Sequence, residues 1–172
     1  MKPTLAKLWA AFPDHVRYPT MKDLYTMLGG AAAKNINSAG FGPNGNTCAS
    51  RLSVAFNEAG APINATIAAA VGAPTLGTAD GSRIIFRVSA LRSYLLRTLG
   101  RPSFDTTTPY DSAFRGKRGI IAFVVNWRDA SGHIALWNGT TYREPDHDDF
   151  STFVDPIVPG VRTTRAEFWA LP

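Results

Sequence analysis

The residue in this sequence best suited to covalent chemistry is Cys48, which follows a loop rich in glycine and asparagine. Apolar residues recur at helical spacing after it, so we predict a helix that Asn46 or Thr47 caps and Gly60 ends. A thiol in the first helical turn lies near the positive end of the helix dipole, which stabilises the thiolate. The backbone N–H of Cys48 is placed to bind the oxyanion of an attacked carbonyl. We therefore interpret Cys48 as a nucleophile; the alternative is a buried thiol that only fills space.

A thiolate nucleophile needs a histidine partner, and the chain has three histidines. His15 is typical of a surface position, and His147 lies among aspartates in a stretch typical of a solvated turn. His133 opens a predicted strand beside the apolar run 119–126, which indicates a buried central strand. A cysteine on a helix that faces a histidine on a strand is the arrangement of papain-like hydrolases. His133 is therefore the predicted base, and the alternative is a core histidine at the start of a strand.

The pair Asn138-Gly139 predicts a two-residue turn, after which the chain returns as a strand over 140–144. In this register His133 faces Glu144, with the two Cβ atoms ~5 Å apart. Glu144 is then placed to accept the imidazole N–H and fix its tautomer, as the acid of a triad does. Asp146 is the alternative acid, and a longer turn would change the register and the choice. If neither serves, Glu144 is an exposed hairpin charge.

Three further side chains near these residues each have two interpretations. Arg51 lies one turn after Cys48, where it either binds a substrate carboxylate or, as we favour, supports the flank of a packed helix. Asn46 either lines a cleft or, as we favour, caps the helix. Trp137 belongs either to the core, which we favour, or to the wall of a substrate cleft.

The elements that must position these residues follow the order helices first, antiparallel sheet later, which predicts an α+β fold in one domain spanning 1–172. A buried Phe168-Trp169 pair is expected to pack the tail on the body. The predicted helices cover 3–12, 20–28 with Gly29-Gly30 as its end, 47–60 and about 90–99, and the predicted strands cover 83–88, 119–126, 133–137 and 140–144.

Composition limits the class of protein. The 172 residues are 45% apolar, which is enough for a packed core. The net charge of +5 is scattered, so we expect no nucleic-acid partner, although anionic peptides are favoured. One cysteine excludes an internal disulfide and a cysteine-rich zinc site, and we expect no metal or cofactor. We see no secretory signal and no apolar stretch that could enter a membrane, so the protein is expected to be made in the cytoplasm.

Three segments together resemble a known family. They are NTCASRLSVAFN at 46–57, GKRGII at 116–121 and GHIALWNG at 132–139. They are similar, in this order, to the motifs of the fourth family of type VI secretion amidase effectors. The family's nucleophile lies in an N-x-C-A-x-R-x-S-x-A-L-N run, and its histidine lies in a G-H-x-x-L-W-[ND]-G run.

The resemblance implies a papain-like fold of the NlpC class and hydrolysis of the amide between γ-D-glutamate and meso-diaminopimelate in peptidoglycan. It implies that the type VI apparatus delivers the protein to the periplasm of a rival bacterium and that a cognate immunity protein protects the producer. By position, Cys48 becomes the nucleophile and His133 the base. The family's acid is commonly Asp, and the matching position here holds Glu144. Some relatives carry extra cysteines near this acid, which this chain lacks.

Two other functions fit the same residues. One is a papain-like peptidase or acyltransferase that acts on proteins. The other is a basic binding module in which Cys48 is only a packing residue.

Overall fold

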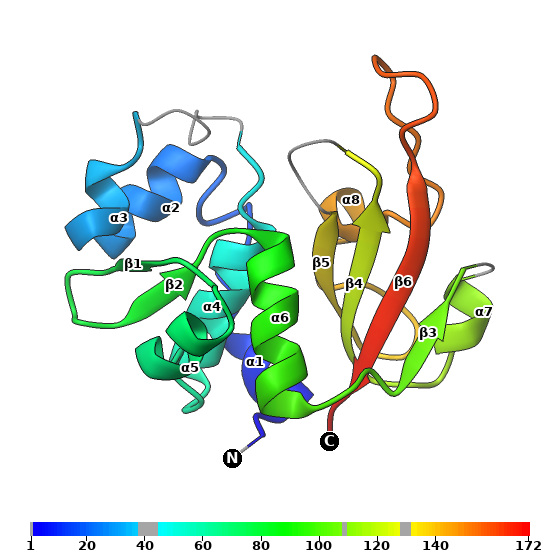
Figure 1. Cartoon of the computed structure of the whole chain (residues 1–172), viewed down its shortest axis with the longest axis horizontal. Coiled ribbons are helices and arrows are strands. Elements are labelled where there is room, and N and C mark those ends of the chain that lie inside the picture. Colours follow the sequence, from blue (N-terminus) through cyan, green and yellow to red (C-terminus); the bar gives the residue numbers. More distant parts are fainter. Residues whose placement is uncertain (1, 38–44, 108–109, 128–131) are drawn as a thin grey trace.

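The computed structural model describes residues 2–37, 45–107, 110–127 and 132–172. The longer helices gather on one side of the molecule and the main sheet on the other (Figure 1), which confirms the predicted α+β class with antiparallel sheets. None of the helices in these ranges combines the length and apolar character that a membrane crossing needs. The helices are α1 (Leu5–Ala11), α2 (Met21–Leu28), α3 (Gly30–Lys34), α4 (Cys48–Glu58), α5 (Ala65–Ala70), α6 (Val88–Leu99), α7 (Tyr110–Phe114) and α8 (Pro145–Asp148), and the strands are β1 (Thr75–Gly77), β2 (Arg83–Ile85), β3 (Phe104–Thr106), β4 (Gly119–Val125), β5 (His133–Trp137) and β6 (Thr163–Ala170).

Helix α4 lies at the centre of the helical layer, and all of its residues from Cys48 to Phe56 are buried. It contacts α1, β2 and β5. Because a helix enclosed on several sides cannot leave polar side chains unpaired, its serines are hydrogen bonded. The Ser50 hydroxyl lies 2.8 Å from the Tyr25 hydroxyl, and the Ser53 hydroxyl donates to the Ile85 carbonyl at 3.1 Å. These bonds fix the helix that begins at Cys48.

The main sheet has the order β3-β6-β4-β5, and every neighbouring pair is antiparallel. Strand β6 therefore lies inside the sheet, between β3 and β4, although the sequence predicted only that this tail packs on the body. A Cβ at Gly119 would overlap the carbonyl oxygen of Trp169, so glycine lets β4 and β6 approach at that point. The apolar run predicted as a buried strand is β4, as expected.

The two faces of the sheet are both buried. One face packs on the helical layer, and its core joins residues from near both ends of the chain, among them Leu5, Leu8, Leu52, Leu91, Ile120, Ile134, Leu136, Trp169 and Leu171. The other face is covered by α7 and nearby side chains, in a second cluster that includes Phe114, Ile121, Phe123, Ala135, Trp137, Tyr142 and Phe168. This burial on both faces explains why β4 and β5 are apolar almost throughout.

The predicted two-residue turn after β5 is wrong. Trp137 pairs with Tyr142, so the loop between them has four residues. The Asn138 side-chain oxygen accepts hydrogen bonds from the backbone N–H groups of Thr140 and Thr141 at 3.0 and 2.9 Å, which stabilises this longer loop. The expected returning strand over 140–144 is limited to that single bridge, and Pro145, which has no N–H to continue a ladder, begins α8 instead.

The glycine pair after α2 has two roles, of which the sequence analysis predicted one. Helix α2 ends at Leu28, as expected, but α3 begins at once with Gly30. Gly30 has a φ of 60°, and a Cβ there would overlap the backbone of Thr78, beyond β1. The pair therefore also allows a close approach of α3 to the small β1–β2 sheet.

Candidate active site

Cys48 is the first residue of α4 and is 4% exposed. Its backbone N–H donates to the side-chain oxygen of Asn46 at 3.0 Å. Thr47 occupies the N-cap position but makes no side-chain capping bond, because its hydroxyl accepts a hydrogen bond from the Arg51 Nε at 2.8 Å. The thiol therefore lies in the first turn of a helix, as predicted, and Asn46 satisfies the N–H group beside it.

His133 is the first residue of β5, and its neighbour Gly132 explains how it reaches that place. Gly132 has a φ of 131°, and a Cβ there would overlap the carbonyl oxygen of Phe123 on β4. Only glycine combines this φ with so close an approach. The register then pairs His133 with Phe123 at the end of the β4–β5 ladder. The Phe150 ring stacks on the imidazole with 4.3 Å between ring centroids.

The imidazole of His133 lies between Cys48 and Asp148. Its Nε2 is 3.0 Å from the Asp148 Oδ1, and the Cys48 side chain is close enough to act on the charge of the ring. Burial lowers the pKa of His133, but the Cys48 thiolate charge and the hydrogen bonds with Asp148 and Cys48 outweigh burial and raise the pKa to about 10. A protonated imidazole beside a thiolate is the charge arrangement that an activated cysteine needs.

Asp148, the last residue of α8, is 2% exposed and holds two partners at once. Its Oδ1 meets His133, and its Oδ2 accepts the backbone N–H of Glu144 at 3.0 Å. The short helix from Pro145 thus folds the carboxylate back toward the imidazole. The residues alone do not indicate Asp148, because the run Asp-His-Asp-Asp at 146–149 is typical of a solvated turn. The signal available was an acid placed one helical turn after an N-terminal proline.

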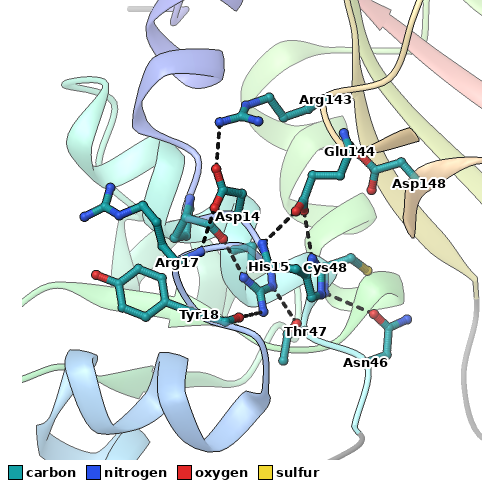
Figure 2. Close-up of polar contacts among 12 residues, drawn as sticks. Asp14, His15, Arg17, Tyr18, Asn46, Thr47, Cys48, Arg143, Glu144 and Asp148 are labelled. Carbon is teal, nitrogen blue, oxygen red and sulfur yellow. Dashed lines mark hydrogen bonds and ion pairs between the residues drawn. The ribbon is translucent and has the colours of Figure 1, made fainter. Parts of the chain in front are cut away.

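Glu144, the acid predicted from the hairpin register, faces a different histidine. Its Oε1 accepts the His15 backbone N–H at 2.6 Å, and its Oε2 lies 2.9 Å from the His15 Nδ1 (Figure 2). Burial raises the pKa of Glu144. The hydrogen bonds and charge of His15 and the charge of Arg51 lower this pKa by more, so it lies below its usual value. The alternative acid, Asp146, is exposed. Neither side chain therefore takes the contact expected of it.

Arg51 is fully buried and supports the backbone, which is the interpretation we favoured. Its guanidinium donates to the carbonyl oxygens of Pro13 and Tyr18, each at 2.6 Å, and to Thr47 (Figure 2). Because it is 0% exposed, no part of it is open to a substrate carboxylate. Burial lowers the pKa of Arg51, while the negative charges of Glu144 and Asp14 raise it in part. Arg51 holds the segment 13–18 against the helix that begins with Cys48.

Asn46 and Trp137 complete the set of predicted site residues. Besides capping Cys48, Asn46 donates from its Nδ2 to the Gly132 carbonyl at 3.2 Å, so one side chain joins the two loops that carry the thiol and the imidazole. Trp137 is 6% exposed and donates from its indole N–H to the Phe114 carbonyl at 3.0 Å. Trp137 is therefore a core residue of the second cluster and does not line a cleft.

The described residues include one group that could hold a metal ion, formed by His15, Glu144 and His147. This group lies beside the Cys48–His133–Asp148 set and shares none of its side chains. The set of Cys48, His133 and Asp148 can do nucleophilic chemistry without a metal, because it contains a thiol, an imidazole and a carboxylate, with the imidazole in the middle.

Comparison with known proteins identifies what the chain resembles as a whole. The sequence profile described as "Type VI secretion system (T6SS), amidase effector protein 4", or Tae4, matches residues 44–169. The crystal structure of Tae4 from Salmonella typhimurium, bound to the immunity protein Tai4 from Enterobacter cloacae, has a TM-score of 0.80 at 30% identity, over 99% of this chain and 100% of that one. The Tae4–Tai4 complex from Enterobacter cloacae gives 0.79 at 30% identity, over 100% of each chain. No curated protein sequence matches the chain.

Proposed function

Because this chain belongs to the Tae4 family of type VI secretion system amidase effectors, we propose that it is a cysteine amidase in which Cys48, His133 and Asp148 form the catalytic triad. The observation that carries the proposal is the order of thiol, imidazole and carboxylate, with the imidazole between the other two groups and the acid 3.0 Å from the ring. Cys48 and His133 keep the roles expected from the sequence. Asp148 takes the role that the sequence analysis gave to Glu144 or Asp146.

The reaction begins with attack of the Cys48 thiolate on the amide carbonyl carbon, which forms a C–S bond and places negative charge on the carbonyl oxygen. The backbone N–H of Cys48 stabilises this oxyanion. In the free protein that N–H donates to the Asn46 side-chain oxygen. The oxyanion would therefore replace the Asn46 oxygen as acceptor, or share the N–H with it.

His133 then acts as the acid. The imidazolium gives its proton to the leaving amine as the C–N bond breaks, and a thioester remains on Cys48. The neutral imidazole next takes a proton from water, and the hydroxide forms a C–O bond with the thioester carbon. The C–S bond then breaks, which releases the carboxylic acid and regenerates the thiolate beside the imidazolium. Asp148 keeps the ring oriented through its bond to Nε2 and stabilises the positive charge each time it forms.

For the substrate, we infer the stem peptide of peptidoglycan, cut at the amide between γ-D-glutamate and meso-diaminopimelate. Support comes from the motifs shared with the effector family and from a net charge of +5, which favours a carboxylate-rich wall peptide. We further propose a papain-like architecture of the NlpC class, delivery by the type VI apparatus, action in the periplasm of the target bacterium, and inhibition by a cognate immunity protein. Complexes of Tae4 with Tai4 support the last point.

The test is mass spectrometry of peptidoglycan digested by the pure protein. New muropeptides that end in a free γ-carboxyl of D-glutamate, absent from a Cys48→Ala digest, are the expected result. Casein is the parallel substrate: cleavage of casein without release of muropeptides would favour the peptidase that acts on proteins. Iodoacetamide labelling distinguishes the binding module, since an activated Cys48 alkylates quickly at neutral pH and an inert buried thiol does not.

A further inference from the structure

A second cluster of chemically active side chains lies next to the triad, on the outer side of the turn that carries Asp148. It consists of His15, Glu144 and His147, each of which offers a nitrogen or oxygen atom within 4.8 Å of the others. His15 comes from the segment after α1, whereas Glu144 and His147 come from the start and the interior of the α8 turn. The cluster therefore joins two parts of the chain that are far apart in sequence.

The three donors have the chemistry of a zinc ligand set. Bonds from zinc to nitrogen or oxygen are about 2.0–2.2 Å, which places tetrahedral ligand atoms about 3.3 Å from one another. The His15 Nδ1 and the Glu144 Oε2 are already 2.9 Å apart. His147 must approach by at most about 1.5 Å and turn its ring, since the two imidazoles now stack with centroids 3.9 Å apart. His147 is exposed, so this rotation is open to it.

Space and charge around the cluster also favour a cation. A surface hollow of about 300 Å³ lies over it, lined by residues 14–16 and 143–147, and leaves room for a water as a fourth ligand. Arg143, a cationic side chain that lines the hollow, is turned to other partners: it donates to the Asp14 carboxylate and to the Trp9 carbonyl, both at 3.1 Å. The charge of the buried Arg51 also acts on Glu144, but its guanidinium is bound to backbone carbonyls and lies outside the hollow. The segment 144–149 carries four carboxylates in a protein of net charge +5.

We propose that His15, Glu144 and His147 bind a divalent cation of the zinc class. The site was not anticipated from the sequence, which led us to expect no metal. The ion would tie the segment of His15 to the turn that begins at Glu144, whose backbone N–H holds Asp148. It would act as a structural clamp on the turn that carries Asp148. It would do so without a cysteine ligand, because Cys48 is the only cysteine in the sequence. The proposal does not depend on the amidase reaction.

The experiment uses the full chain without a histidine tag and with Cys48→Ala, because zinc could otherwise bind the catalytic thiol and His133. Zinc chloride is titrated into this protein by calorimetry at neutral pH. Cobalt(II) replaces zinc in a second titration, in which a tetrahedral site gives strong visible absorption. We expect one bound ion per chain and a melting temperature that rises with zinc and falls again with a chelator.

Matched variants locate the ion. Adding His147→Ala should weaken zinc binding by at least about tenfold and remove the cobalt absorption, because one ligand is lost. Adding Asp146→Asn, an exposed acid in the same turn that is not one of the three donors, should leave the affinity nearly unchanged. Absence of binding at millimolar zinc, or equal weakening by His147→Ala and Asp146→Asn, would overturn the proposal and leave an ordinary His–Glu pair. His147 is exposed, so its removal tests binding without threatening the fold.

Discussion

Asp148→Asn separates the acid observed beside His133 from the two acids expected from the sequence. The substitution keeps the size of the side chain but removes the charge that faces the His133 Nε2 at 3.0 Å. A hydrogen bond between charged groups contributes about 1.5–3 kcal/mol, and one pKa unit corresponds to about 1.4 kcal/mol. The pKa of His133 should therefore fall from about 10 to about 8–9.

The direction of the effect on activity depends on which protonation state of the His133 imidazole the reaction uses. In the proposed mechanism the amine leaves with a proton from the imidazolium, so activity should be present below the pKa of His133 and be lost as the pH rises through it. The alkaline limb of the pH–activity profile should move to lower pH in Asp148→Asn. At neutral pH the imidazole of His133 should stay mostly protonated in this variant. We still expect a loss of about 10²–10⁴ in kcat/KM, because asparagine no longer holds the ring in the correct orientation and tautomer.

Two assays check this prediction. Lysis of purified peptidoglycan across pH gives the alkaline limb, and NMR of ¹⁵N-histidine-labelled protein follows His133 itself, since the chain has only three histidines. Glu144→Gln and Asp146→Asn are the matched controls. An alkaline limb that shifts in Glu144→Gln and stays in place in Asp148→Asn would refute the assignment of the acid.

Three other substitutions test neighbouring parts of the site. Cys48→Ala should abolish wall lysis and change the melting temperature little, because alanine nearly replaces a small buried thiol. Arg51→Ala should lower the free energy of unfolding by about 3–5 kcal/mol, measured with urea, because the carbonyls that it binds lose their partner. Asn46→Ala should lower kcat more than it raises KM, because the loops of thiol and imidazole lose their link; Asn46→Asp can restore the bond to the Cys48 N–H but not the bond to Gly132.

Each of these has a clear contrary result. Wall lysis retained by Cys48→Ala would exclude thiolate catalysis. A change of less than about 1 kcal/mol in Arg51→Ala would show that water replaces the guanidinium at low cost. Full activity in Asn46→Ala would mean that α4 and β5 hold the two groups in place without that side chain.

The sequence predicted best where a local pattern decides the structure. Helical spacing after a loop placed Cys48 at the start of α4, and the apolar run followed by a short strand placed His133 beside it. Helix α4 is long enough, and strand β4 apolar enough, to be predicted from the sequence without knowledge of their tertiary contacts. The same patterns indicated that Arg51 and Trp137 belong to the packed interior, which their burial confirms.

The carboxylate that contacts His133 was missed because its position depends on a turn that local sequence describes poorly. Asn138-Gly139 is a strong signal for a two-residue turn, yet the Asn138 side chain caps a four-residue loop and the register shifts. The carboxylate that meets His133 then comes from a short helix whose acidic sequence is also typical of a surface turn. The contact with His133 that identifies Asp148 is tertiary, and the local signal for this residue was limited to its place one helical turn after Pro145.

Strand β6 was missed as a strand for a related reason: its residues alternate poorly, and its partners are distant in the chain. It pairs with β3 and with β4, which do not pair with each other. The pairs that β6 makes with these two strands join residues that are far apart in the chain, and such contacts form late in folding because a long loop must close first. During refolding, amidase activity should therefore recover only in the slowest phase, when β6 has inserted between its two neighbours.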